Sequence, residues 1–367
     1  MGSPGSAKMA HAPSCSPRPL SSPARAATAV SGRPTLNLAL QGGGAHGAFT
    51  WGVLDALLED GRLDFDGISG SSAGAMNAVV LAQGLLVGGR DGARAALRQF
   101  WTALADTMPV DVTRHDHAGG VQLAPALKLW MMWAHYASPA QLNPLDLNPL
   151  RELLAAQIDF ERLRRAAPVR LFIAATHADS GRLRLFGNEE LSVDALLASG
   201  CLPTLFRAPR IDGQTYWDGG YAANPAVFPL LERGRARDTL LVLLSPLDLP
   251  PTNGSDTAQG IQARIAEIAF TTAFRREMQA IARARAQAAG HWWPAPPWAG
   301  PGARSRFHLI EAGPALEHLP GETRLAVNRK FFDTLHALGR DSAGQWLARH
   351  FDAIGRRDSV DLQARFA

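Results

Sequence analysis

The chain has 367 residues, 46% of them hydrophobic and 19% charged, which is typical of a globular protein long enough to bury a full core. Its formal net charge of +4 comes with scattered arginines and no dense basic block in the folded part. Nucleic acid is therefore a poor candidate partner, whereas a mild attraction to anionic membrane surfaces is compatible with the charge.

Two cysteines, Cys15 and Cys201, are too few for a disulfide framework. We therefore expect a reducing compartment, the cytoplasm, with a peripheral position at the inner membrane surface as a second interpretation. No run of about 18 apolar residues is present, so no membrane span is expected.

Residues 1–33 are rich in Ser, Pro, Ala and Gly and contain no long apolar run. This composition predicts a disordered N-terminal tail, and it lacks the apolar core of a secretory signal. Arginines and serines with few acids also leave a transit peptide open as an alternative. The folded domain is expected over residues 34–367.

Apolar runs and helical periodicity alternate along this domain. Strands are expected at 36–40, 65–69, 169–176, 182–186, 211–216, 239–244 and 307–311. Helices are expected at 48–58, 75–84, 93–106, 148–156, 192–200, 258–289 and 326–351. Strands with buried patterns separated by helices predict an α/β fold, a three-layer α/β/α sandwich around a mainly parallel central sheet.

Two segments stand apart from this alternation. Residues 108–147 are predicted as a helical, lid-like insertion, because residues 121–137 are rich in Leu, Met and Trp with only Lys128 charged. Such a segment either covers an apolar site, touches lipid or packs as a core helix. Residues 320–367 are predicted as a helical extension at the C-terminus.

The pentapeptide Gly70-Ser71-Ser72-Ala73-Gly74 fits the G-x-S-x-G pattern between a strand and a helix. This context is that of a nucleophile elbow, a tight turn in which Gly70 and Gly74 allow close backbone approach. Ser72 is the candidate nucleophile, and its place at a helix N-terminus favours a developing negative charge.

A second glycine-rich turn, Gly42-Gly43-Gly44, follows the first strand. Its backbone N–H groups are candidates for an oxyanion hole, the donors that stabilise a tetrahedral intermediate. With Gly47 the turn also satisfies G-x-G-x-x-G, so a dinucleotide site, or a non-catalytic nucleotide or lipid binder, is an alternative. No Lys-Ser/Thr follows, which excludes a Walker A loop.

A serine nucleophile needs a base, and Asp218 in Trp217-Asp218-Gly219-Gly220 is the candidate. The two glycines fix a turn and leave room beside the carboxylate, although Asp-Gly-Gly is also ordinary turn chemistry. A Ser-Asp-His triad is the mechanistic alternative. Six histidines, all after Ser72 in the chain, are candidates to complete it: His177, His291, His308, His318, His336 and His350.

These motifs, in this order, resemble those of bacterial patatin-like phospholipases over roughly residues 36–362. The resemblance implies a lipid acyl hydrolase with a Ser-Asp dyad and no cofactor. Ser72 attacks an ester carbonyl, Asp218 takes its proton, and water releases the acyl group from Ser72.

One position departs from the family pattern. Many members carry Arg or Lys, a fixed positive charge, where this chain has His46. Two interpretations of His46 are open: a titratable charge that replaces the fixed one, or a side chain that packs on a neighbour. The spacing of His115-Asp116-His117 is compatible with a metal site, but a solvated loop is the preferred interpretation and no metal is expected.

Overall fold

The computed structural model describes residues 32–107, 113–115, 121–124, 137–247, 257–289, 304–313, 316, 319 and 321–366. The chain divides into a unit of residues 1–32 and a unit of residues 33–367, and every element below belongs to the second. The tail expected over residues 1–33 therefore lies almost entirely outside the described residues.

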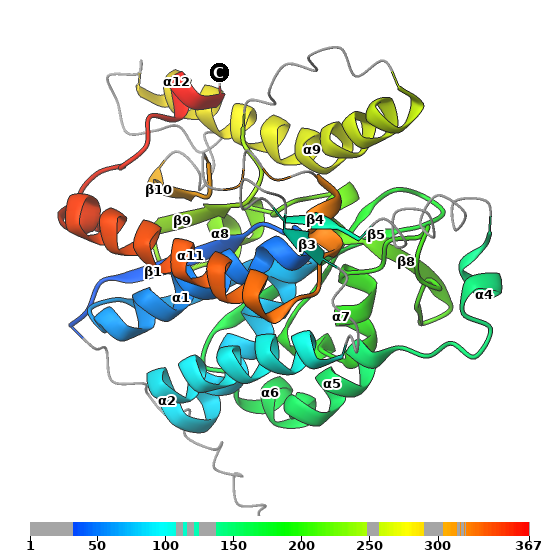
Figure 1. Ribbon diagram of the computed structural model, residues 1–367. Coiled ribbons are helices and arrows are strands. Elements are labelled where there is room, and N and C mark those ends of the chain that lie inside the picture. The colour runs from blue at the N-terminus through cyan, green and yellow to red at the C-terminus, as the bar shows by residue number, and fades with distance from the viewer. Residues whose placement is uncertain are drawn as a thin grey trace, which may run out of the picture. The chain divides into compact units, whose positions relative to one another are not determined.

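A single eight-stranded sheet organises the second unit, with strand order β10-β9-β1-β2-β5-β8-β7 and β6 paired with β5 (Figure 1). The strands are β1 (Thr35–Leu40), β2 (Asp64–Ser71), β5 (Arg170–His177), β6 (Leu183–Phe186), β7 (Arg210–Ile211), β8 (Gln214–Asp218), β9 (Asp238–Leu243) and β10 (Arg306–Glu311). From β10 to β5 all neighbours are parallel, whereas β6 and β8 run antiparallel to β5. The expected α/β class with a mostly parallel sheet is confirmed.

Helices cover both faces of the sheet. They are α1 (Gly47–Asp60), α2 (Ala73–Asp106), α4 (Pro139–Leu142), α5 (Pro149–Gln157), α6 (Phe160–Ala166), α7 (Val193–Ser199), α8 (Phe228–Arg233), α9 (Ala258–Ala289), α11 (Arg329–His350) and α12 (Leu362–Phe366). Short 3-10 helices connect them: η1 (Gly44–His46), η2 (Asn188–Glu190), η3 (Gly219–Tyr221), η6 (Gly321–Leu325) and η7 (Phe351–Ala353).

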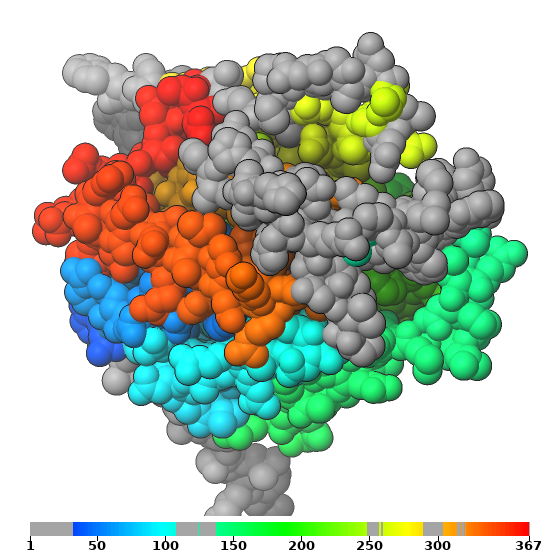
Figure 2. Space-filling model, in the orientation of Figure 1, coloured from blue at the N-terminus to red at the C-terminus, as the bar shows by residue number. Residues whose placement is uncertain are grey.

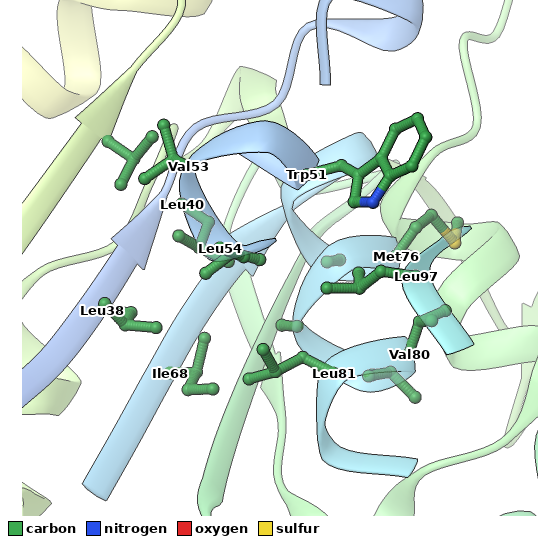
Figure 3. Packing of buried hydrophobic residues seen from close by; sticks show 14 of the residues in the cluster. Leu38, Leu40, Trp51, Val53, Leu54, Ile68, Met76, Val80, Leu81 and Leu97 are labelled. Atoms are coloured by element: carbon green, nitrogen blue, oxygen red, sulfur yellow. The ribbon is translucent and has the colours of Figure 1, made fainter. Parts of the chain in front are cut away.

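The side chains of β1 alternate between two clusters of buried hydrophobic residues, one on each face of the sheet. Leu38 and Leu40 belong to the cluster that includes residues of α1, α2 and α11, as Figure 3 shows for part of it. Ala39 belongs to the other cluster, with residues of α8, α9 and α12. Successive side chains of a strand point to opposite faces, so this pattern requires two helical layers around one sheet.

Two glycines bring α1 and α11 into close contact. A β-carbon on Gly52 would lie 2.0 Å from the carbonyl oxygen of His336, and one on Gly339 would lie 2.0 Å from that of Phe49. In Figure 2, α11 (orange) lies over α1 (blue) beside α2 (cyan). This packing places η6, which precedes α11, against η1 at the first glycine turn.

The helices expected at 75–84 and 93–106 are present as two helical segments of α2, separated by a kink with non-helical backbone at Gly88 and Gly89. Other elements differ from the sequence expectations. Helices α6 and α8 were not expected. Within the predicted insertion, β3 (Thr113–His115) and β4 (Val121–Leu123) pair antiparallel, although 121–137 was predicted as helical, and residues 125–136 lie outside the described residues.

Helix α11 occupies most of the range expected for the last helix. In the part of the chain that the structure describes, no helix is both long and apolar enough to cross a membrane.

Candidate active site

The turn from β2 to α2 has the geometry of a nucleophile elbow. Strand β2 ends at Ser71, α2 begins at Ala73, and Ser72 between them has φ 50° and ψ −122°. This conformation is rare for a residue with a side chain and marks backbone strain of the kind that clusters at functional sites. The strand-turn-helix context expected for Ser72 is therefore present.

The flanking glycines are required by close backbone contacts. A β-carbon on Gly70 would lie 2.6 Å from the carbonyl carbon and oxygen of Gly74. A β-carbon on Gly74 would lie 2.2 Å from the carbonyl oxygen of Leu40, at the end of β1. The turn therefore closes on itself and on the neighbouring strand.

Ser199, at the end of α7, holds the backbone of the elbow. Its Oγ accepts a hydrogen bond from the N–H of Ser72 at 2.9 Å. The next residue, Gly200, also lies beside the elbow, because its β-carbon would be 3.8 Å from Ser72 Oγ. Ser199 was not predicted as a site residue, since one serine near a helix end carries no distinguishing pattern.

Asp218 lies at the last position of β8, and three backbone contacts fix it there. Its N–H donates to the carbonyl oxygen of Cys201 at 2.8 Å, and its own carbonyl oxygen accepts from Thr176 Oγ1 at 2.8 Å. A β-carbon on Gly219 would lie 2.2 Å from the carbonyl oxygen of Ala174. The following glycine is thus needed for β8 to approach β5.

The structure brings the Asp218 carboxylate to the Ser72 hydroxyl, which donates a hydrogen bond to it. Asp218 is 1% exposed, and its Oδ1 also accepts the N–H of Gly220 at 2.7 Å. Burial raises the pKa of Asp218 to about 7, against the opposing effect of these two hydrogen bonds. The carboxylate is thus a far better base near neutral pH than an ordinary aspartate.

Aromatic side chains surround the Asp218 turn. Tyr216 is buried, whereas Trp217 is 36% exposed. Phe270 of α9 covers Gly220, whose β-carbon would lie 2.4 Å from its ring.

The first glycine turn lies directly against the elbow. A β-carbon on Gly42 would be 2.6 Å from the carbonyl oxygen of Ser71 and 2.9 Å from Cβ of Ser72. Gly44 has φ 57°, and its β-carbon would meet the carbonyl oxygen of Arg324 at 2.2 Å. A β-carbon on Gly47, the first residue of α1, would lie 2.6 Å from Cβ of Ala73, the first residue of α2.

The N–H of Gly42 is already engaged. It donates a hydrogen bond to Oδ1 of Asn224 at 2.7 Å. Of the three glycines expected to donate to the oxyanion, Gly42 therefore has its N–H occupied by Asn224. The N–H groups of Gly43 and Gly44 have no hydrogen-bond acceptor within the described part of the chain. Asn224 was not predicted, because it follows Asp218 in a loop with no motif of its own.

His46 is buried and neutral. Burial, with a contribution from the charge of Arg324, lowers its pKa to about 3. Its Nε2 lies 2.8 Å from Oγ1 of Thr323, and its ring packs edge-on against Phe331. The sequence left two interpretations of His46, a titratable charge in the glycine-rich motif or a side chain that packs on a neighbour. The structure shows the second arrangement.

The histidines proposed for a triad lie elsewhere. His177 contacts Gln214 at 2.5 Å, and His308 contacts Asp238 at 3.1 Å and Ser359 at 3.0 Å. His336 faces Asp55 at 3.3 Å. Among the residues that the structure describes, no histidine is hydrogen bonded to Ser72 or Asp218, while His291 and His318 fall outside them.

No group of three or more metal-ligating side chains occurs in the described segments. Of the metal candidate His115-Asp116-His117, the last two residues lie outside those segments.

A left-handed serine between a parallel strand and a helix, hydrogen bonded to a buried acid, defines a protein of the nucleophile-elbow class. The family model "Patatin-like phospholipase" matches residues 38–231, more than half of the chain. The chain belongs to this family, as the order of its motifs predicted, and the family implies lipid acyl hydrolase activity.

The solved structures that match include VipD from Legionella pneumophila, at 17% identity and a TM-score of 0.34 over 84% of this chain and 67% of that one. The ExoU–SpcU complex of the type III secretion system of Pseudomonas aeruginosa matches at 17% identity and a TM-score of 0.30, over 86% of this chain. This chain spans about half the length of that match, 52%. No curated protein matches the sequence significantly.

Proposed function

We propose that this protein hydrolyses carboxylic esters of lipids, with Ser72 as nucleophile and Asp218 as general base. The observation that carries the proposal is the hydrogen bond from the Ser72 hydroxyl to a buried carboxylate whose pKa is raised to about 7. A serine hydroxyl is a weak nucleophile until a neighbouring base removes its proton. Membership of the patatin-like phospholipase family supports a lipid ester as the substrate class.

In the first step, Ser72 Oγ attacks the ester carbonyl carbon while its proton moves to Asp218. The N–H groups of Gly43 and Gly44 stabilise the oxyanion of the tetrahedral intermediate, and the N-terminus of α2 adds its partial positive charge. The carbonyl-to-alkoxy bond then breaks, and the leaving alcohol takes the proton from Asp218. An acyl group remains on Ser72.

In the second step, water attacks the acyl-Ser72 ester as Asp218 accepts one of its protons. Collapse of this second tetrahedral intermediate releases the fatty acid and returns the proton to Ser72 Oγ. The same carboxylate serves both steps, and no histidine or cofactor is required.

Covalent labelling tests this proposal. A fluorophosphonate probe, followed by peptide mapping, is expected to modify Ser72 of the wild-type protein and not the Ser72→Ala variant. Ser180→Ala, which removes an exposed serine of the β5–β6 turn, is the matched control and is expected to label normally. Absence of label on Ser72 with folded protein would favour a non-catalytic binder that uses the first glycine turn.

A further inference from the structure

The side chain of Asn224 is hydrogen bonded to both backbone groups of Gly42. Its Oδ1 accepts the N–H of Gly42 at 2.7 Å, and its Nδ2 donates to the carbonyl oxygen of Gly42 in a longer contact of 3.5 Å. Asn224 is only 2% exposed, so both contacts are shielded from water. Both ends of the Asn224 amide are thus used on one residue of the first glycine turn.

The contact with the Gly42 carbonyl oxygen sets the direction of the next N–H group. The peptide bond between Gly42 and Gly43 is trans. In a trans peptide, the C=O of one residue and the N–H of the next point in opposite directions. Because the Gly42 carbonyl faces Asn224, the Gly43 N–H points away from Asn224. Glycine backbones resist rotation least, so a run of three glycines needs an outside contact to keep this peptide plane fixed.

Asn224 is itself held in place by the elbow and by the end of β1. Ser71 Oγ of the elbow donates to the carbonyl oxygen of Ala223 at 2.6 Å. Gln41, the residue after β1, donates from Nε2 to the carbonyl oxygen of Asn224 at 3.4 Å. The Gln41 Oε1 in turn accepts two backbone N–H groups just after β9, at 2.6 and 2.9 Å. Buried contacts therefore fix Asn224 relative to both glycine turns.

We propose that Asn224 is a positioning residue for the oxyanion hole. It holds the peptide between Gly42 and Gly43 so that the Gly43 N–H faces the oxyanion that forms when Ser72 attacks the ester. The inference rests on the proposed ester hydrolysis and adds to it a residue that acts through Gly42 and contacts no reacting atom. Donors that are oriented in advance need no reorganisation as charge develops, so their direction affects the rate.

A pair of ketones measures the oxyanion hole separately from binding of the ground state. Ser72 Oγ adds to the carbonyl carbon of hexyl trifluoromethyl ketone, its proton passes to Asp218, and the carbonyl oxygen becomes an oxyanion. Hexyl methyl ketone has the same chain but lacks the fluorines that make this addition favourable. Its inhibition constant therefore reports binding of the chain and the neutral carbonyl, whereas that of the trifluoroketone also reports stabilisation of the oxyanion.

Replacing Asn224 by alanine removes both contacts with Gly42. For Asn224→Ala we expect kcat for a short p-nitrophenyl ester to fall about 10²-fold, as for a lost oxyanion donor, with KM within about threefold. The inhibition constant of the trifluoroketone is expected to rise by the same factor as kcat falls, and that of hexyl methyl ketone is expected to stay unchanged. The pH midpoint of kcat/KM is expected to remain that of the wild type, because Asp218 keeps its own backbone contacts.

Asn188→Ala is the matched control for the lost hydrogen bonds. Asn188 also joins two backbone groups, since its Oδ1 accepts the N–H of Leu171 and its Nδ2 donates to the carbonyl oxygen of Val169, both at 2.9 Å. These contacts lie at the start of β5, whereas Asp218 pairs near its end. Asn188→Ala is expected to lower Tm and to leave kcat and both inhibition constants unchanged.

Asn224→Asp tests the direction of the peptide in a variant of the same size. An aspartate keeps an oxygen that accepts the Gly42 N–H, so this buried donor stays bonded even if Asn224→Ala does not fold. The second carboxylate oxygen offers the Gly42 carbonyl no donor, and we expect the trifluoroketone to bind this variant weakly as well. Wild-type kcat and inhibition in Asn224→Asp would overturn the inference, because they would show that the Gly42 N–H needs only an acceptor.

Three results with Asn224→Ala would also overturn the inference. They are wild-type inhibition by the trifluoroketone, an equal loss of affinity for both ketones, and a shifted pH midpoint, which would make Asn224 a support of Asp218. A wild-type protein that the trifluoroketone does not inhibit and that fluorophosphonate does not label at Ser72 would instead refute the proposed function. The wild-type measurements thus separate the two failures.

Discussion

The Ser72 hydroxyl donates a hydrogen bond to the Asp218 carboxylate, which is withdrawn from solvent and also accepts the N–H of Gly220. The two residues are 146 positions apart in the sequence and come from different strand ends, β2 and β8. Strand β5 lies between these strands and pairs with both, so the sheet itself sets the position of the acid relative to the nucleophile.

Replacing the acid tests its role as base. Asp218→Asn keeps an oxygen that can accept the Gly220 N–H but removes the proton acceptor. We expect kcat for a short p-nitrophenyl ester to fall about 10²- to 10⁴-fold, the usual contribution of a general base. Near-UV circular dichroism is expected to remain that of the wild type. A folded Asp218→Asn variant with wild-type kcat would exclude Asp218 as the base.

The raised pKa of Asp218 predicts a pH dependence of activity. The base works only when ionised, and its pKa in the free protein is about 7. We therefore expect kcat/KM to rise roughly tenfold per unit of pH below this value and to level off above it. The measurement is kcat/KM for a neutral ester between pH 5 and 9. A profile that is flat from pH 5 to 8 would contradict a buried, protonated carboxylate in the resting site.

The same pKa predicts a pH-dependent cost in stability. An unfolded aspartate titrates near 3.9, so between about pH 4 and 7 the folded state holds a proton that the unfolded state has lost. The free energy of unfolding therefore falls as pH rises through this window, by an amount of order 4 kcal/mol for a shift of about three units. Asp218→Asn lacks this cost.

We accordingly expect the Tm of Asp218→Asn minus that of the wild type to increase from pH 5 to pH 8. Glu277, whose pKa burial also raises to about 7, is present in both proteins and cancels in the difference. Differential scanning calorimetry at several pH values makes the comparison. A Tm difference that stays constant with pH would mean that Asp218 titrates alike in the folded and unfolded states.

The parts of the site that the sequence predicted are those with local signals. The elbow at Ser72 needs glycines at fixed offsets, and the turn after Asp218 needs Gly219 to pass β5, so each leaves a recognisable pattern. The strands were also predictable, because their apolar runs are long and the sheet buries both faces.

The residues that were missed reach the site through tertiary contacts. Ser199, Asn224 and Arg324 are ordinary residue types at a helix end, in a loop and in a 3-10 helix, and nothing near them in the sequence marks them. By contrast, the glycines between the helices expected at 75–84 and 93–106 did mark a break, because the backbone inside α2 is non-helical at Gly88 and Gly89.

The triad alternative makes an opposite prediction for His308. This fully buried residue joins Asp238 of β9 to Ser359, so His308→Ala is expected to lower the free energy of unfolding by about 2–4 kcal/mol. Activity per folded molecule is expected to stay within about twofold of the wild type, and Ser72 is expected to label with fluorophosphonate. Loss of labelling in a protein that remains folded at the assay temperature would support a histidine-dependent mechanism.

Close contact between the two glycine turns predicts that Gly42 cannot gain even one carbon without displacing Ser72. A β-carbon there would lie 2.6 Å from the carbonyl oxygen of Ser71 and 2.9 Å from Ser72 Cβ, so the Gly42→Ala backbone must shift away from the elbow. A displacement of about 1 Å at a reacting group costs about 10²-fold in rate, and we expect kcat to fall by that order. Gly187→Ala is the control, because its β-carbon would meet no atom within 4 Å and its φ of −86° suits alanine. Wild-type kcat in Gly42→Ala would mean that the first glycine turn does not position the nucleophile, whereas a loss confined to Gly42→Ala ties that turn to the chemistry at Ser72.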